Sequence, residues 1–236
     1  MNTCFVAAAY KIPDERIKAW TAGNHDLMVQ HGYEALIITD RIIEGLPEWC
    51  KHLIYPKPMQ TFSITKCKNY GIRCVGEDVV VATDIDVEFS PEFMEAIHGI
   101  VDNEVLFPLY FAVTKFGERG CMHPWFKPCG TTAAMFSSWE SVKGYNENMV
   151  AYGSDDGDLF NRFTFQGKFN IIRRLHPIWH VAHDGSTVTF DDRSDQWNRT
   201  LGTDPGFNPR NVDHNRNLLL TTNWCADPEA ENWGKP

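Results

Sequence analysis

The sequence lacks three features, each of which would indicate a particular class of protein. No apolar run approaches the roughly 18–20 residues that a membrane-spanning helix needs. The seven cysteines are scattered without a C-x-x-C pair, which argues against a zinc ribbon and against a disulfide framework. Basic residues are few: the chain has 22 lysines and arginines and 31 acids. Its net charge of −9 argues against a protein that binds nucleic acid through non-specific electrostatic attraction.

What is present is the composition of an ordinary globular domain. The chain has 236 residues, of which 43% are hydrophobic and 22% charged, so it can bury a core without disulfides. Residues 1–6 lack the basic start and the long apolar stretch of a signal peptide. We therefore expect one large domain in the cytoplasm.

Apolar runs alternate with helical patterns through the first hundred residues. Strands are expected at 3–9, 34–40 and 77–83, and helices after Pro13, at 61–74 and after the Ser90-Pro91 pair. This alternation predicts an α/β domain with a mostly parallel sheet. Ligands bind beyond the carboxyl ends of such strands, so Tyr10, Asp40 and Asp84 should lie along one edge.

The second half is less regular and richer in glycine, proline and aromatic residues. Short helices are expected at 139–144 and at 156–165, the second with Leu159, Phe160 and Phe163 on its apolar face. From residue 184 onward the chain is polar and is expected to be rich in loops.

Two acidic groups could carry chemistry. Asp84 and Asp86 follow an apolar strand, and carboxylates leaving a strand end can converge on one Mg²⁺ or Mn²⁺ ion. Residues 152–158 read Tyr-Gly-Ser-Asp-Asp-Gly-Asp. Three carboxylates crowded at a helix start repel one another, which raises the proton affinity of at least one, as a general base requires.

Two further pairs are spaced for binding. His180 and His183 can share a metal. Lys66 and Asn69 should share a helix face, where a cation and an amide could hold a nucleotide or a sugar. Taken singly, all four groups are more typical of structural roles: a solvated turn, an acidic helix start, structural histidines and a solvated helix face.

Together, and in this order, the four groups resemble a nucleotide-sugar-dependent glycosyltransferase of the GT-A fold. The segment from Lys66 to Asp86 is similar to the donor half of that fold. Residues 130–162 are similar to the β-1,4-galactosyltransferase family and to the galactosyltransferase domain of chondroitin-type polymerases. The family pattern W-G-G-E-D-D-D-I-F-N-R falls on residues 152–162, where Ser154, Asp155 and Gly157 depart from its acidic loop.

The resemblance implies an organisation and a set of roles. It implies a single GT-A domain over 1–236, with a nucleotide-sugar half at about 1–100, an acceptor half at about 101–185 and a tail at 186–236 that could close over the donor. It implies an inverting transfer, with UDP as the favoured nucleotide. The implied roles are metal binding (Mn²⁺ or Mg²⁺) by Asp86, His183 and His180, catalytic base for Asp156, acceptor binding by Asp155, Tyr152 and Gly130, and nucleotide-sugar binding by Tyr10, Asp40, Phe62, Lys66, Asn69 and Asp84.

Alternatives from two other classes stay open. A haloacid-dehalogenase-type phosphatase would use Asp84 as nucleophile and Asp155 with Asp156 for Mg²⁺, although its motif normally ends the first strand of the domain. A non-catalytic module would bind sugars or nucleotides through aromatic side chains, of which the chain has many. The acceptor is open as well: a saccharide is the default, and a hydroxylated base in phage DNA is the other possibility.

Overall fold

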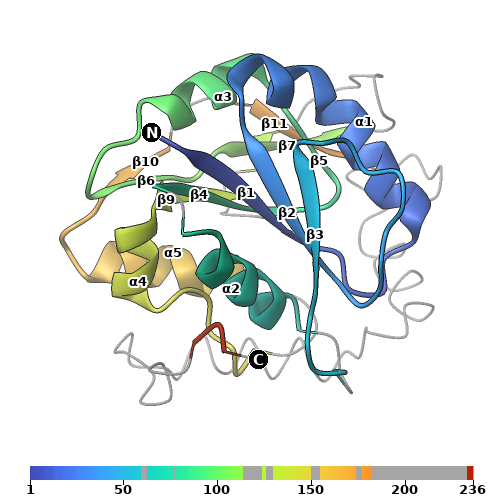
Figure 1. The fold of residues 1–236 in the computed structure, drawn as a ribbon. Coiled ribbons are helices and arrows are strands. Elements are labelled where there is room, and N and C mark those ends of the chain that lie inside the picture. Colours follow the sequence, from blue (N-terminus) through green and yellow to red (C-terminus); the bar gives the residue numbers. More distant parts are fainter. Residues whose placement is uncertain are drawn as a thin grey trace, which may run out of the picture.

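The protein forms two β-sheets with helices packed on the larger one (Figure 1). The computed structural model describes residues 1–59, 63–76, 78–113, 124–125, 130–149, 155–173, 177–181 and 233–235. The large sheet has the order β10-β6-β9-β4-β1-β2-β3. Its strands are β1 (Thr3–Ala8), β2 (Glu34–Thr39), β3 (Cys50–Ile54), β4 (Val79–Asp84), β6 (Glu104–Leu106), β9 (Thr132–Met135) and β10 (Asn170–Ile172).

The large sheet is mostly parallel, as the sequence predicts. Strands β3, β2, β1 and β4 run parallel to one another, and β10 runs parallel to β6. Strand β9 is antiparallel to both of its neighbours, β4 and β6. The carboxyl ends of β1, β2 and β4 therefore meet at one edge, where an α/β sheet binds its ligands.

The described residues contain five helices, which cover the two faces of this sheet (Figure 1). Helices α1 (Asp14–His31) and α3 (Pro91–His98) pack on one face, around Trp20 and Phe93. Helices α2 (Ile64–Val75), α4 (Phe136–Val142) and α5 (Asp155–Phe165) pack on the other, around Trp139 and Phe163. Each face of the sheet thus has its own buried apolar layer, which fixes the helices relative to the strand ends.

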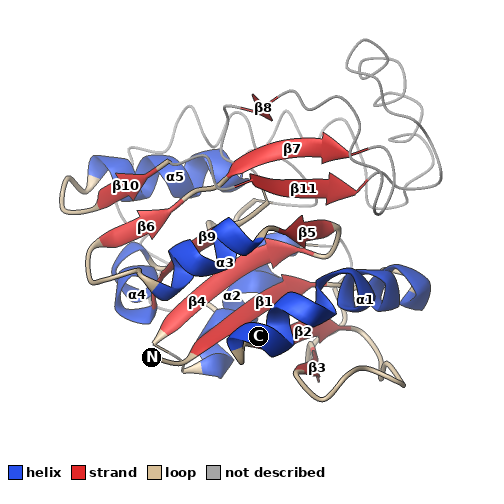
Figure 2. Cartoon of the chain, turned by 90° about the horizontal axis from the view of Figure 1, so that it is seen from above, coloured by secondary structure: helices blue, strands red, loops and turns tan. Residues whose placement is uncertain are grey.

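A smaller sheet, ordered β5-β11-β7-β8, lies beside the large one (Figure 2). Its strands are β5 (Val87–Phe89), β7 (Leu109–Val113), β8 (Pro124–Trp125) and β11 (Pro177–Val181). Strand β5 follows β4 after a turn of two residues and pairs antiparallel with β11, with His180 opposite Val87. This pairing brings the end of β11 toward the turn that contains Asp86.

Local chemistry sets most of the predicted helix boundaries. The Ser90 hydroxyl accepts a hydrogen bond from the Phe93 amide and caps α3 as expected, with Pro91 at its first position. Helix α2 begins at Ile64, three residues after its predicted start, and α5 begins at Asp155, one residue before its predicted start. Helix α4 begins at Phe136, three residues before its predicted start, and ends at Val142. Among the described helices, none combines the length and the apolar character that a membrane span requires.

Candidate active site

The carboxyl edge of the large sheet brings together the residues predicted to meet there. Asp84, the last residue of β4, pairs in register with Ala8 of β1. Just beyond β1, the backbone amide of Lys11 donates a 2.9 Å hydrogen bond to the Asp40 carboxylate beyond β2. The Tyr10 hydroxyl accepts a 3.0 Å hydrogen bond from the Met59 amide. The prediction that these strand ends share one edge is correct.

A fully buried lysine on α2 pairs with the first acid of the D-x-D motif. The Nζ atom of Lys68 lies 2.7 Å from Oδ1 of Asp84, and the Lys68 side chain is 0% exposed. The same Nζ lies 3.3 Å from the carbonyl oxygen of Gly130. It also lies 5.2 Å from the centre of the Tyr145 ring. A buried ammonium group needs such partners because it has lost its water.

Gly130 connects this lysine to the start of α5. Its backbone amide donates a 2.7 Å hydrogen bond to Oδ2 of Asp156, while its carbonyl accepts from Lys68. Gly130 has a φ of 62°, a left-handed conformation that favours glycine. The other carboxylate oxygen of Asp156, Oδ1, is buried and has no hydrogen-bond partner among the described residues. One oxygen of Asp156 is thus held by the Gly130 amide, and the other is left without a hydrogen-bond partner among the described residues.

Burial shapes the acid–base behaviour of this cluster. Burial and repulsion from Asp155 together raise the pKa of Asp156 to about 6, against the opposing effects of Lys68 and the Gly130 amide. Burial also raises the pKa of Asp84 to about 6, against the effect of Lys68 and with added repulsion from Asp86 and Asp156. The pKa of Asp155 is raised by burial as well. A carboxylate with a pKa near 6 can both stay ionised at neutral pH and accept a proton.

The predicted metal-binding set is described only in part. Asp86 lies in the turn between β4 and β5, and it interacts electrostatically with Asp84. His180 is in β11, opposite Val87, but its side chain is not among those described, and His183 lies outside the described residues. The described side chains contain no cluster of three or more potential ligands arranged around one ion. The carboxylates of Asp84 and Asp86 fit a hard divalent cation in kind, since such ions prefer oxygen ligands.

Lys66 and Asn69 do not share a face, contrary to the prediction. Lys66 is exposed, whereas Asn69 is fully buried. The Asn69 amide donates hydrogen bonds to the carbonyl of Tyr145 and to the Glu147 carboxylate, and its oxygen accepts one from the Tyr145 amide. The spacing of three residues failed because α2 turns Asn69 inward to hold this loop. Binding of the donor by either residue stays a prediction.

Of three other predicted residues, the structure describes one and leaves two outside the described ranges. Phe62, proposed to contact the nucleotide base, and Tyr152, proposed for the acceptor, lie outside the described residues. Most of the expected tail lies outside them too, except 233–235. Asp155 begins α5 and is buried, 7% exposed, beside Asp156. The structure therefore brings Asp84, Asp155, Asp156 and Gly130 together around Lys68.

Sequence reasoning missed Lys68, although a signal was present. Ile64, Lys68 and Ile72 are spaced four residues apart, so Lys68 occupies a position on the apolar stripe of α2. A lysine on such a stripe is almost never fully buried unless it is paired. Arg41 was also missed: its guanidinium contacts the carboxylates of Asp14 and Asp40 and thereby holds the predicted nucleoside-binding acid.

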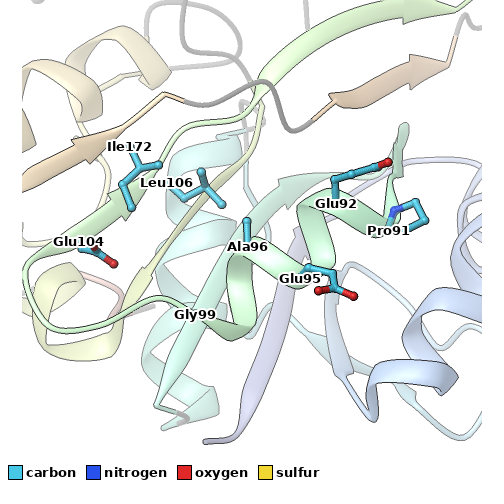
Figure 3. Close-up of a pocket in the computed structure, with 8 residues that line it drawn as sticks. All are labelled: Pro91, Glu92, Glu95, Ala96, Gly99, Glu104, Leu106 and Ile172. Atoms are coloured by element: carbon cyan, nitrogen blue, oxygen red, sulfur yellow. The ribbon is translucent and has the colours of Figure 1, made fainter.

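A cavity of about 650 Å³ lies away from these residues, at the α3 face of the sheet (Figure 3). Its lining combines apolar Ala96, Leu106 and Ile172 with Glu92, Glu95 and Glu104, and includes no lysine or arginine. Glu92 and Glu95 are exposed to solvent. Although this cavity is sizeable, it contains none of the predicted site residues.

Comparison with known sequences supports the resemblance over part of the chain. Residues 113–184, less than a third of the sequence, match the profile of the family described as "N-terminal domain of galactosyltransferase". This segment includes Gly130, Asp155, Asp156, His180 and His183. No curated protein matches the sequence of the chain.

Solved structures extend the likeness to most of the chain. The catalytic domain of Drosophila β1,4-galactosyltransferase 7, in complex with xylobiose, has a TM-score of 0.55 at 10% identity, over 83% of this chain and 80% of that one. A mannosyltransferase from Pyrobaculum calidifontis, in complex with GDP-mannose and Mn²⁺, has a TM-score of 0.55 at 11% identity, over 94% and 70%.

A third similar structure, GalNAc-T7 with UDP, GalNAc and Mn²⁺, has a TM-score of 0.57 at 10% identity, over 77% of this chain and 44% of that one. The predicted enzyme class, a glycosyltransferase, agrees with all three structures and with the matching segment. The chain has the GT-A fold, and its second half carries the galactosyltransferase sequence pattern that the resemblance predicted.

Proposed function

We propose that the protein is a glycosyltransferase that moves a sugar from a nucleotide-sugar to an acceptor hydroxyl. The observation that carries this proposal is that two acidic segments lie close together at the carboxyl edge of the large sheet. Asp84 ends β4 and Asp86 lies in the turn after it, while Asp156 is the second residue of α5 and has one carboxylate oxygen held by Gly130. The GT-A fold and the galactosyltransferase-like segment support the same reaction.

Asp156 is the proposed catalytic base. Its Oδ2 atom is fixed by the Gly130 amide, so Oδ1 is the atom that accepts the proton of the acceptor hydroxyl. As that O–H bond breaks, the acceptor oxygen forms a bond to the anomeric carbon of the sugar. The bond from this carbon to the donor phosphate breaks, and the nucleoside diphosphate leaves. A single displacement of this kind inverts the anomeric centre.

Asp86 is the proposed metal ligand, together with His183 and His180, for Mn²⁺ or Mg²⁺. When bound there, such an ion would neutralise negative charge on the leaving diphosphate. The pairing of β11 with β5 supports this set, because His180 stands opposite the residue after Asp86 and His183 follows β11 by two residues. A histidine at position 180 would make the site harder, and less selective for Mn²⁺, than the methionine that the family resemblance implies there.

Asp40 and Tyr10 are proposed to line the nucleotide side of the site. Both lie beyond neighbouring parallel strands, and Asp40 is held by the Lys11 amide and by Arg41. UDP as the nucleotide and a saccharide as the acceptor are proposed from the family resemblance. The phosphatase alternative expects the D-x-D strand to be the first in its domain, whereas β4 follows three other strands.

The proposal is tested with a panel of sugar nucleotides, each incubated with the protein and Mn²⁺. We expect nucleoside diphosphate to be released from one of them, and we expect EDTA to stop the release. Binding of a sugar nucleotide without any release would instead support the non-catalytic module. Neither binding nor release with any member of the panel would contradict the proposal.

A further inference from the structure

Lys68 is a positive charge that contacts Asp84 and lies near Asp155 and Asp156. It reaches them from α2, on the face of the sheet that α4 and α5 also cover. Its side chain is 0% exposed, and its Nζ lies 2.7 Å from Oδ1 of Asp84. Burial by itself would lower the Lys68 pKa, but Asp84, Tyr145, Asp156 and Asp155 together hold it well above the usual value. The side chain is therefore a permanent internal cation.

This cation is connected to both acidic elements by short contacts. On one side it pairs directly with Asp84 at the end of β4. On the other side it donates to the Gly130 carbonyl at 3.3 Å, and the amide of the same residue holds Asp156 at 2.7 Å. The Gly130 carbonyl accepts from Lys68, and the Gly130 amide donates to Asp156. Lys68 therefore fixes the orientation of Gly130, and Gly130 in turn fixes the Asp156 carboxylate.

We propose that Lys68 is a positioning residue for sugar transfer: its ammonium group fixes Asp84 and, through Gly130, the carboxylate of Asp156. The distance between Asp84 on the donor side and Asp156 on the acceptor side is thereby kept constant. This inference rests on the proposed function. Lys68 touches neither the acceptor nor the sugar in this account; it acts through two other residues.

The charge of Lys68 gives the proposal a distinctive signature. A cation held beside the acids repels a divalent ion bound at the same strand end. Removing the charge should therefore tighten Mn²⁺ binding, and it also releases an Asp84 oxygen. The same change should slow turnover, because Gly130 and Asp156 lose their anchor. A lysine that served only to stabilise the fold would give weaker binding and slower turnover together.

The test compares Lys68→Met with the wild-type protein in the full chain. Methionine keeps the length and apolar stem of lysine but not its charge. We expect kcat to fall about 10-fold or more, while the Kd for Mn²⁺, measured from the electron paramagnetic resonance signal of the free ion, falls about 10-fold. Lys51→Met is the matched control, since Lys51 forms an ion pair with Glu34 at 2.6 Å that is 62% and 52% exposed. It should leave both quantities unchanged.

A second background protects the test against loss of folding. Lys68→Met leaves the partly buried Asp84 carboxylate without its cation and should lower the melting temperature by about 10 °C. Asp84→Asn removes that carboxylate, so the double variant Lys68→Met/Asp84→Asn should recover most of the loss. Relative to Asp84→Asn alone, the double variant should again bind Mn²⁺ more tightly and turn over more slowly.

Two results would overturn the inference while leaving the proposed function intact: a kcat for Lys68→Met within twofold of wild type, or a Kd for Mn²⁺ that rises as kcat falls. A wild-type protein that turns over no sugar nucleotide would overturn the proposed function itself, and this inference with it.

Discussion

Two groups of acidic side chains lie near the large sheet, and they differ in what surrounds them. At the carboxyl edge, Asp84 and Asp156 are close to a fully buried lysine, and burial raises the pKa of each to about 6. In the cavity beside α3, Glu92 and Glu95 face solvent, and no lysine or arginine lines the space. The cavity has a volume of about 650 Å³, but the strand edge has acids whose protonation and position the protein controls. The raised pKa values of the acids at the strand edge therefore identify the site better than the volume of the cavity does.

The largest expected difference between the two regions is in catalysis. Replacing Asp156 with asparagine keeps an oxygen that can accept from the Gly130 amide but removes the base. We expect kcat for nucleoside diphosphate release to fall about 10²–10⁴-fold. Glu95→Gln, in the α3 cavity, is the matched change of one acid to its amide and should leave kcat unchanged. Equal losses in the two variants would remove the distinction between the regions.

The next difference is in tolerance to an added methyl group. Gly144 has a φ of 60°, and a Cβ there would lie 2.3 Å from Oδ1 of Asn69, which is fixed by its hydrogen bonds to residue 145. Gly144→Ala should therefore lower the free energy of unfolding by about 3 kcal/mol. Gly99, which lines the α3 cavity, has a φ of −90° and nothing closer than 3.8 Å. Gly99→Ala should change stability by less than about 0.5 kcal/mol.

Urea unfolding of the two alanine variants measures this difference directly. The expectation for Gly144 fails if its variant unfolds at the same urea concentration as the Gly99 variant. Such a result would mean that the loop held by Asn69 yields easily, and that α2 is not fixed rigidly beside the site.

The smallest expected difference is in the dependence of stability on pH. The folded protein binds a proton at Asp156 with a pKa of about 6, whereas an unfolded aspartate has a pKa of about 3.9. Stability from this group is therefore complete below about pH 4 and is lost as the pH rises through 6. Asp156→Asn cannot titrate. Its stability relative to wild type should be greater at pH 7.5 than at pH 5, by on the order of 1 kcal/mol.

Thermal melts of Asp156→Asn and wild type at the two pH values check this sign, and Glu95→Gln serves as the control that should track wild type at both. A relative stability of Asp156→Asn that decreases with rising pH would show that the folded protein favours the ionised carboxylate.

Features that depend on local chemistry could be predicted from the sequence. The Ser90-Pro91 helix start, the strand before Asp84 and the helix start at Asp155 follow from capping, apolar runs and spacing. The position of Asp84 at the end of β4 follows from the same pattern, because the apolar run of a buried strand ends where the strand reaches solvent.

Features that depend on long-range pairing could not be predicted. Strand β9 is four residues long and inserts antiparallel between β4 and β6, a choice that no local pattern encodes. The link from Lys68 to Asp156 requires Gly130 to lie between α2 and α5, which only the tertiary structure shows. The spacing of Lys66 and Asn69 predicts a shared ligand-binding face, but Asn69 is buried, where its amide group forms hydrogen bonds with the backbone of Tyr145.

The most direct test of the account is to locate manganese in a crystal of the full chain grown with Mn²⁺ and a nucleoside diphosphate. The account predicts an anomalous manganese peak within coordination distance of the Asp86 carboxylate, with the diphosphate between it and Asp156. A peak among Glu92, Glu95 and Glu104, with none at Asp86, would contradict the account.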